Sequence, residues 1–341
     1  MGLIIGLILG IQGVTGALLA WRTPLNRVVN RHLYVVTPGA TRLSYEELAI
    51  RAQAARPEAK LEYFRAFAAP DAPVMMGFTD DIYVHLNPYD GSVLGLRSRF
   101  GDSLGWVEGW HKYLQLRPSI GGPIVGTVAF GFIVMILTGI VLWWPSTRRA
   151  LRAGVTINWK LSGRPWNLGL HKTVGIYATL VVLVSALTGV PIALKWIQRA
   201  FFSLEVTAPA SPSGGEQPFV GSDVIVRELD RLMPLAHDIY VQLPRRGLVK
   251  THAIAADAPH LNARSYAWFN PEDGALLRYA PYSEAGNGFR AYYWMLSLHT
   301  GLIGGWVAQL LLSLGALAVP VLVYTGAASY LQRKFRRRRP A

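Results

Sequence analysis

Three histidines lie beside long apolar stretches of the chain, where an imidazole is unusual. His111 and His299 each come shortly before such a stretch, among Trp and Tyr residues, and His171 stands at the start of another. A neutral imidazole is a good iron ligand, and both axial positions of a haem accept histidine. For one such residue alone, a hydrogen bond to a carbonyl or a lipid headgroup is the simpler interpretation. The matched pair of His111 and His299 favours ligation of a haem iron.

The lack of cysteine and the positions of the other histidines narrow the chemistry further. Without cysteine the sequence has no thiolate nucleophile, iron–sulfur cluster, Cys-ligated zinc or covalent c-type haem. No Gly-rich loop follows an expected strand, so nucleotide binding has no support. We expect the remaining histidines to be surface or half-buried polar residues. They are His32, His85, His237, His252 and His260. His252 and His260 would bind a metal only if strand pairing brought them together.

Four apolar stretches are long enough to cross a membrane, which takes about 20 residues. None of them contains an internal Asp, Glu, Lys or Arg. The first stretch lacks the basic leader of a signal peptide and is longer than the apolar region of one, so we interpret it as a span. The stretches are Gly2 to Trp21, Ile120 to Trp144, Val174 to Leu194 and Leu302 to Tyr324.

The net charge of +14 is distributed as the positive-inside rule describes for membrane proteins. All 20 acidic residues fall in the long segments 22–117 and 196–298, whose net charges are only +2 and −1. The short segment 145–170 and the C-terminal tail carry 11 basic residues and no acidic residue. We therefore place these two segments and both termini in the cytoplasm and the long segments outside. The basic tail is interpreted as an anchor to anionic lipid and not as a nucleic-acid site.

The order of motifs repeats once along the chain. Each apolar stretch ends in a Thr-Gly pair, and the segment NPYDG at 87–91 returns as NPEDG at 270–274. Landmarks of the first half recur in the same order in the second half, at offsets that grow from 173 to 188 residues. We therefore predict two parallel repeats of span, outer module and span, related by an axis along the membrane normal. The pairs begin at Thr15, Thr138, Thr188 and Thr325.

The repeat has two consequences for the histidines. His111 and His299 are equivalent, because they stand 27 and 26 residues before the Thr-Gly pair that follows each. They should lie at one depth and face each other. His171 precedes Thr188 by 17 residues, and the equivalent position of the first repeat falls before Met1. We therefore expect a matching histidine upstream of Met1, in a longer reading frame or in an N-terminus that has been removed.

The two long segments have the pattern of small α+β modules. In the first, Ser44 and Glu47 fit a capping box before a helix that ends near Ala55. In the second, a helix is expected from about Asp223 to Leu232. Strands and a Gly-containing turn follow each helix. The expected strands are 82–86, 93–96, 239–243 and 267–269.

Several motifs together resemble those of the PepSY-associated transmembrane family. This family includes inner-membrane reductases of ferric siderophores that carry b-type haem. The resemblance implies that His111, His171 and His299 match the family's membrane histidines and that the outer modules are periplasmic and PepSY-like. The HRW-like sequence that usually opens the first span is absent here and would fall before Met1. The motifs are NPYDG at 87–91, WHKYL at 110–114, TGIVLWWP at 138–145, LHKTVG at 170–175 and LHTG at 298–301.

The expected fold is an α-helical membrane protein with four transmembrane helices in two parallel tandem repeats, each with an extramembrane α+β PepSY-like module. The length of the chain and its two long polar segments leave room for both modules. The expected segments are transmembrane helix 1 at 1–21, periplasmic module 1 at 22–117, transmembrane helix 2 at 118–145, a cytoplasmic loop at 146–170, transmembrane helix 3 at 171–196, periplasmic module 2 at 197–298, transmembrane helix 4 at 299–331 and a basic cytoplasmic tail at 332–341.

The expected function is a haem-b-containing reductase of the bacterial inner membrane. It would pass electrons from a cytoplasmic or quinol donor to a periplasmic acceptor, which the resemblance implies is a ferric siderophore. His111 and His299 would ligate one haem iron, and His171 a second one together with the histidine upstream of Met1. The alternatives are a cofactor-free membrane sensor or inhibitor that binds a periplasmic peptide or protein, and a haem-bearing electron shuttle without a substrate site. A transporter is disfavoured, because no charge interrupts a span.

Overall fold

The chain folds as two compact units in the computed structural model, which describes residues 2–98, 101–202, 208–210, 218–245 and 247–336. One unit, here called the membrane unit, contains Met1–Arg22, Trp106–Ala200 and Met295–Ala341. The other, here called the sheet unit, contains Thr23–Gly105 and Phe201–Trp294. Each unit thus combines segments from both halves of the sequence. The last residues of the basic tail, 337–341, lie outside the described part of the chain.

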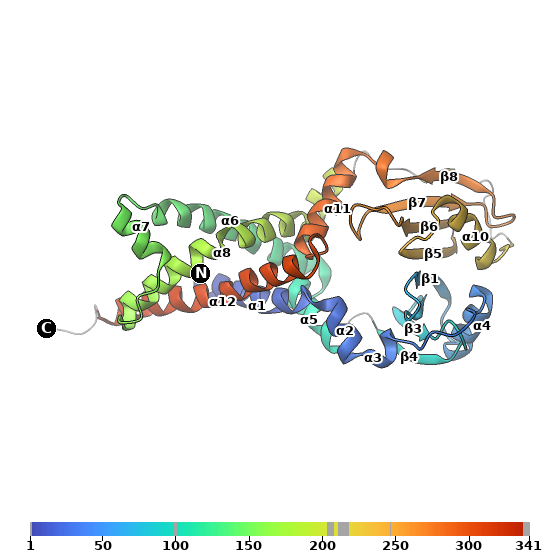
Figure 1. The fold of residues 1–341 in the computed structure, drawn as a ribbon, viewed down its shortest axis with the longest axis horizontal. Coiled ribbons are helices and arrows are strands. Elements are labelled where there is room, and N and C mark those ends of the chain that lie inside the picture. Colours follow the sequence, from blue (N-terminus) through green and yellow to red (C-terminus); the bar gives the residue numbers. More distant parts are fainter. Residues whose placement is uncertain (1, 99–100, 203–207, 211–217, 246, 337–341) are drawn as a thin grey trace. The chain divides into compact units, whose positions relative to one another are not determined.

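Long apolar helices build the membrane unit (Figure 1). Three of the described helices are long and apolar enough to cross a membrane, namely α6 (Pro118–Trp143), α8 (Gly163–Ala193) and α12 (Gly305–Arg336). A further helix, α1 (Gly2–Leu19), qualifies only together with α2 (Arg22–Val29), from which it is bent by 67°. The protein is therefore a helical membrane protein with three or four spans.

Two helices begin elsewhere than the sequence predicted. Helix α8 begins at Gly163, so His171 lies within the helix and not at its start. His299 is the last residue of α11 (Asn287–His299) and precedes the fourth long helix. Helix α11 ends at His299, and Gly301, Gly304 and Gly305 follow with φ angles of +71°, +84° and +58°. These positive φ angles interrupt the right-handed helix before α12 begins. Helix α12 then runs to Arg336, beyond the expected end at 331.

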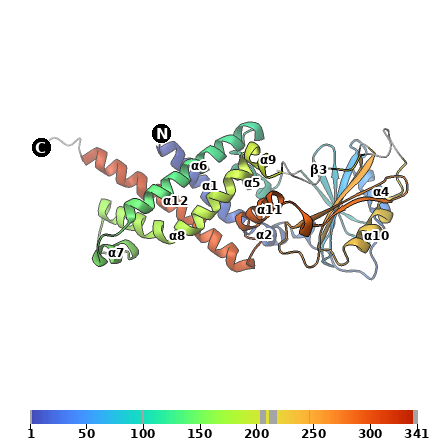
Figure 2. The same cartoon turned by 90° about the horizontal axis from the view of Figure 1, so that it is seen from above.

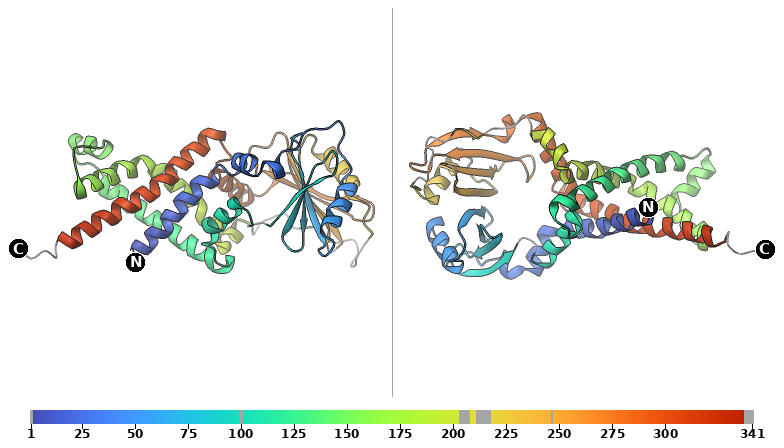
Figure 3. Two further views of the ribbon diagram at one scale, coloured as in Figure 1. Left: turned by 90° about the horizontal axis from the view of Figure 1, so that it is seen from below. Right: turned by 180° about the vertical axis from the view of Figure 1, so that it is seen from behind.

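Helix α12 packs against both α1 and α8, and α6 packs mainly against α8 (Figure 3). Small residues allow the close approach of α1 and α12, since a Cβ atom at Gly13 would lie 2.6 Å from the carbonyl oxygen of Ala316. Trp21 donates a hydrogen bond from Nε1 to Ser313 Oγ across the same interface, at 2.8 Å. The buried apolar core of the bundle consists of Leu9, Ala178, Val182 and Val319.

The sheet unit contains one eight-stranded antiparallel sheet with the order β4-β3-β2-β1-β5-β6-β7-β8. From the centre of the sheet outward, the strands follow in sequence order, β1 to β4 on one side and β5 to β8 on the other. The central strands β1 and β5 pair over Tyr63–Phe67 and Asp238–Gln242. Arg65 of β1 binds Asp238 of β5 in an ion pair at this junction. The two expected modules are therefore joined into a continuous sheet, which the sequence did not indicate. The strands are β1 (Leu61–Phe67), β2 (Val74–Phe78), β3 (Ile82–Leu86), β4 (Val93–Ser98), β5 (Asp238–Arg245), β6 (Leu248–Ile254), β7 (Arg264–Phe269) and β8 (Leu276–Ala280).

Helices α4 (Tyr45–Ala55) and α10 (Ser222–Leu232) cover one face of this sheet (Figure 2). Ser44 Oγ accepts a hydrogen bond from the backbone N–H of Glu47 at 3.1 Å, which confirms the Ser44 half of the predicted capping box. The carboxylate of Glu47 accepts a hydrogen bond from Arg51 at 2.6 Å. The two helices also cap each other. Asp223 Oδ1 accepts from the N–H of Tyr45 at 2.9 Å, and Glu46 Oε1 accepts from the N–H of Asp223 at 2.8 Å. The remaining described helices are α3 (Arg31–Tyr34), α5 (Ser103–Tyr113), α7 (Arg148–Val155), α9 (Lys195–Phe202) and the 3₁₀ helix η1 (Tyr282–Glu284).

The reciprocal cap predicts that Asp223→Ala destabilises the sheet unit by about 1 kcal/mol, because the first turn of α4 loses an acceptor. Asp223→Asn keeps an oxygen and should cost less. Glu228→Ala is the control, because Glu228 forms an exposed ion pair with Arg231 on the same helix. Thermal unfolding of the detergent-purified protein followed by circular dichroism measures the difference. Equal shifts for Asp223→Ala and Glu228→Ala would contradict the cap.

The buried His85 predicts a loss of stability in acid. Burial lowers the pKa of His85 from 6.5 to about 4, and nearby His32 lowers it further while Asp102 opposes this. Between pH 6.5 and 4 the unfolded chain therefore binds a proton that the folded chain does not. The free energy of unfolding falls by up to about 1.4 kcal/mol for each unit by which the pH is lowered in this range. His85→Leu should flatten the dependence of the melting temperature on pH in this window. Parallel curves for the wild type and the variant would refute this assignment.

Candidate functional site

The structure brings His111 and His299 together in the membrane unit. His111 lies in the last turn of α5, and His299 ends α11. Their ring centroids are 6.3 Å apart, and the ring planes meet at 46°. These two residues are 188 positions apart in the sequence, so only the tertiary fold joins them. His171 lies on α8 and has a different set of neighbours.

Each of the three histidines contacts one of the Thr-Gly pairs on a neighbouring long helix. In every case the imidazole Nδ1 lies at hydrogen-bond distance from the threonine Oγ1. The sequence had indicated these threonines only as signs of a repeat, and their recurrence once in each apolar stretch was the available signal. The distances are 3.0 Å from His111 to Thr15 of α1, 3.1 Å from His299 to Thr188 of α8, and 3.0 Å from His171 to Thr325 of α12.

The hydroxyl proton of each threonine is already used, and this fixes the imidazole tautomer. Thr15 donates to the carbonyl of Ile11 at 2.6 Å, and Thr188 and Thr325 donate in the same way to the carbonyls four residues earlier. A hydroxyl has one proton, so Oγ1 must accept the N–H of the imidazole Nδ1. His299 Nδ1 also lies 3.0 Å from the carbonyl oxygen of Ser185, which can only accept. The neutral rings therefore carry their proton on Nδ1 and a lone pair on Nε2.

The glycine of each pair leaves room for the imidazole. A Cβ atom at Gly16 would lie 3.1 Å from His111 Cε1, and one at Gly189 would lie 3.0 Å from His299 Cε1. The corresponding distance from Gly326 to His171 is 3.6 Å. The fourth pair differs, because no described atom outside its own helix environment lies within 4 Å of a Cβ built at Gly139.

Burial keeps the paired histidines neutral. It is the largest cause that lowers the pKa of His111 to about 3, and the neighbouring His299 lowers it further. Burial also lowers the pKa of His299. Both residues lie on α5 and α11, outside the long spanning helices. At neutral pH each imidazole therefore keeps the lone pair that a metal ligand requires.

The pair fits a haem iron better than a metal held by protein ligands alone. No group of three or more His, Asp or Glu side chains that could hold a metal is found in the described ranges of the chain. A haem iron needs only two protein ligands, because the porphyrin supplies the other four. Metal–imidazole bonds near 2 Å place the centres of two axial rings roughly 6 Å apart. The observed separation of 6.3 Å satisfies this requirement.

The other histidines have neighbours that do not form a metal site. His252 of β6 stacks on Tyr240 at a centroid distance of 4.5 Å. The Nε2 atom of His260 lies 3.0 Å from the hydroxyl of Tyr282. His85 and His260 are more deeply buried than the sequence suggested, with 2% and 5% of their surface exposed. His85 lies on β3, and the ring of Tyr34 in α3 packs against it at a centroid distance of 5.3 Å.

The glycine contacts predict unequal effects of identical substitutions. Gly189→Ala should lower the melting temperature, because its Cβ atom would force the imidazole of His299 to move. Gly139→Ala is the matched control on α6 and should be neutral or stabilise the helix by up to about 1 kcal/mol, since alanine has the higher helix propensity. Thermal unfolding in detergent compares the two variants. A larger loss for Gly139→Ala would show that these glycines do not serve to seat an imidazole.

Comparison with known proteins identifies the family of the chain. A search of the curated proteins finds no significant match. The family model for the PepSY-associated TM region matches residues 1–333, which is nearly the whole sequence and includes all three histidines and all four Thr-Gly pairs. The match confirms the resemblance that the sequence motifs indicated, and the chain belongs to the family of PepSY-associated transmembrane proteins.

Proposed function

We propose that this protein is a haem-b-bearing oxidoreductase of the bacterial inner membrane, with His111 and His299 as the two axial ligands of one haem iron. The observation that carries this proposal is the shared geometry of the histidines. Each Nδ1 is bound to a threonine hydroxyl, which leaves Nε2 for a metal, and the paired rings lie 6.3 Å apart. A b-type haem held there would accept and release one electron at a time.

The protein residues orient and tune the ligands. Thr15 and Thr188 accept the Nδ1 protons and so fix the ring orientation and raise the basicity of Nε2, as second-shell acceptors do at metal sites. The adjacent glycines keep the backbone close to the rings. The burial of both imidazoles disfavours their protonation, which would compete with ligation.

His171 is the proposed ligand of a second haem near the other end of α8. It has the same threonine acceptor and the same glycine beside its ring as the paired histidines. It precedes Thr188 by 17 residues on one continuous helix, which corresponds to about 25 Å. His171 would supply one axial ligand there, and the second would come from the histidine expected upstream of Met1. Two haems at these positions would carry electrons across most of the bilayer.

The charge distribution supports an orientation with both termini and the loop 146–170 in the cytoplasm and the sheet unit in the periplasm. Electrons would then enter from a cytoplasmic or quinol donor beside His171. They would leave from the haem of His111 and His299 to a periplasmic acceptor. The preferred acceptor is a ferric siderophore, because reduction of Fe(III) to Fe(II) by one electron weakens the hold of hard oxygen ligands and releases the iron.

The sheet unit offers a surface for such an acceptor on the face opposite α4 and α10. Residues alternate between the faces of a strand, so Tyr63 and Tyr240 point away from the core that contains Phe64 and Val241. The ring of Tyr240 lies 4.8 Å from that of Tyr63 in a tilted arrangement and stacks on His252 at 4.5 Å. Two cations lie over neighbouring rings, Lys250 at 5.1 Å from Tyr266 and Arg264 at 5.5 Å from Tyr293. Aromatic and cationic side chains together suit an anionic chelate.

A cofactor-free sensor or inhibitor is the second candidate. The terminal strands β4 and β8 leave the sheet with two edges, and an extended peptide can pair with such an edge. An electron shuttle without a substrate site would keep the haems but would not require the aromatic face of the sheet. The reductase and the shuttle therefore differ from the sensor or inhibitor first in whether the purified protein contains haem.

Absorption spectra of the oxidised and dithionite-reduced protein test the proposal. The wild type should show the bands of six-coordinate b-type haem, and His111→Ala or His299→Ala should abolish those of the paired site. His32→Ala is the control, because His32 is exposed and lies on α3. A pyridine haemochrome assay of the wild type and His171→Ala counts the haems at the two sites. A colourless protein from haem-replete cells, or spectra unaffected by His111→Ala and His299→Ala, would overturn the proposal.

A further inference from the structure

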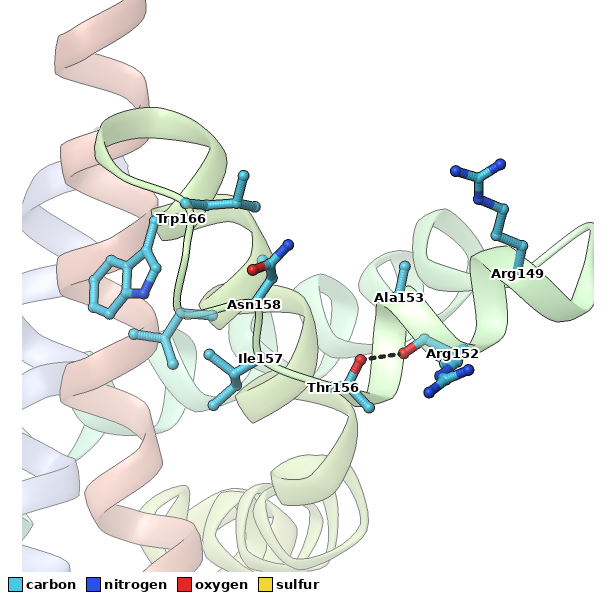
Figure 4. Close-up of a pocket in the computed structure, with 10 residues that line it drawn as sticks. Arg149, Arg152, Ala153, Thr156, Ile157, Asn158 and Trp166 are labelled. Atoms are coloured by element: carbon cyan, nitrogen blue, oxygen red, sulfur yellow. Dashed lines mark hydrogen bonds between the residues drawn. The ribbon is translucent and has the colours of Figure 1, made fainter.

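A basic cavity and an apolar groove adjoin each other where α7 meets the long helices of the membrane unit. The cavity has a volume of about 330 Å³, and its polar lining residues include Arg149, Arg152, Thr156 and Asn158. The side chains of Arg149 and Arg152 extend to different sides of α7 (Figure 4). The groove has a volume of about 640 Å³ and lies along α8 and α12. Thr156 and Ile157 line both spaces, so the two share a wall at these residues. The apolar residues of the groove include Val174, Val181, Leu311, Leu314 and Ala318.

The end of α7 that separates the two spaces is held in place by side chains of α6 and α8. Thr147 caps the start of α7 and accepts a hydrogen bond from the N–H of Ala150 at 3.1 Å. Three carbonyl oxygens at the end of α7 accept hydrogen bonds from the neighbouring helices, so the walls of both spaces are formed in advance of any ligand. The donors are Trp143 to Gly154 at 3.3 Å, Tyr177 to Val155 at 3.1 Å and Thr173 to Thr156 at 3.3 Å.

The charge around the cavity selects for an anion. The segment 145–170 contains five basic residues and no acidic residue. Trp144 and Trp159, which are 75% and 74% exposed, flank α7 in the sequence, and exposed tryptophans are typical of the lipid–water interface. A quinone would match the apolar groove but has no anionic headgroup for the two arginines. The basic residues are Arg148, Arg149, Arg152, Lys160 and Arg164.

We propose that this bipartite space binds an anionic phospholipid, with the phosphate near the basic surface of α7 that Arg149 and Arg152 provide and an acyl chain in the groove between α8 and α12. The occupant follows from the combination, because basic pockets beside membrane helices bind anionic headgroups and the adjoining groove is apolar. The lipid would fix α7 to the bundle at the surface of the membrane. This inference is independent of the proposed haem chemistry.

Native mass spectrometry of the full chain, titrated with phosphatidylglycerol and with phosphatidylcholine, tests the site. The wild type should retain phosphatidylglycerol in preference to phosphatidylcholine. The double variant Arg149→Gln and Arg152→Gln should weaken phosphatidylglycerol binding on the order of tenfold. Its matched control, Arg148→Gln and Lys160→Gln, removes the same charge from residues that do not line the cavity.

A second pair of variants tests the groove. Leu314→Trp should fill it and weaken binding, whereas Leu317→Trp changes an exposed residue of the same helix that does not line it. Equal losses from the cavity variant and its charge-matched control would show diffuse attraction to anionic lipid and overturn the site. Equal retention of both lipids would overturn the anionic preference. A co-purified quinone that phosphatidylglycerol does not displace, with binding unaffected by the arginine variants, would assign the groove to the quinone instead.

Discussion

The arrangement of the membrane unit depends on the hydrogen bond between a threonine hydroxyl and an imidazole Nδ1. An imidazole N–H away from water must have an acceptor, because an unpaired polar group costs several kcal/mol in apolar surroundings. A helical threonine supplies that acceptor once its own proton is bound to the carbonyl four residues earlier, as in Thr15, Thr188 and Thr325. The glycine that follows lets the ring approach the helix. One dipeptide thus fixes the tautomer, the orientation and the position of a histidine.

This bond also connects elements that would otherwise be held only by apolar contacts. His111 fixes α5 to α1, His299 fixes α11 to α8, and His171 joins α8 to α12. Apolar side chains of membrane helices gain little by exchanging lipid for one another, so directional bonds and close packing determine which helices meet. The same three bonds leave one nitrogen of each histidine available, which connects the stability of the bundle to its proposed chemistry.

The sheet unit follows a different principle, in which backbone pairing unites the two halves of the sequence. Strands β1 and β5 pair at the centre, and the ion pair of Arg65 with Asp238 reinforces their register. The mutual capping of α4 and α10 through Glu46 and Asp223 joins the helices above them. One face of the sheet packs against this core, and the other carries aromatic and basic side chains.

Features that depend on neighbouring residues were predictable from the sequence. The long apolar helices, the cap at Ser44 and strand β3 follow from local composition and spacing, although β1, β2, β6 and β8 were not predicted. The repeat also indicated that His111 and His299 would meet. The sequence did not reveal the threonine partners, which lie 96 to 154 residues from their histidines, or the pairing of β1 with β5. Only the tertiary structure decides such contacts, because many residues of the same types compete for each partner until packing brings one pair within reach.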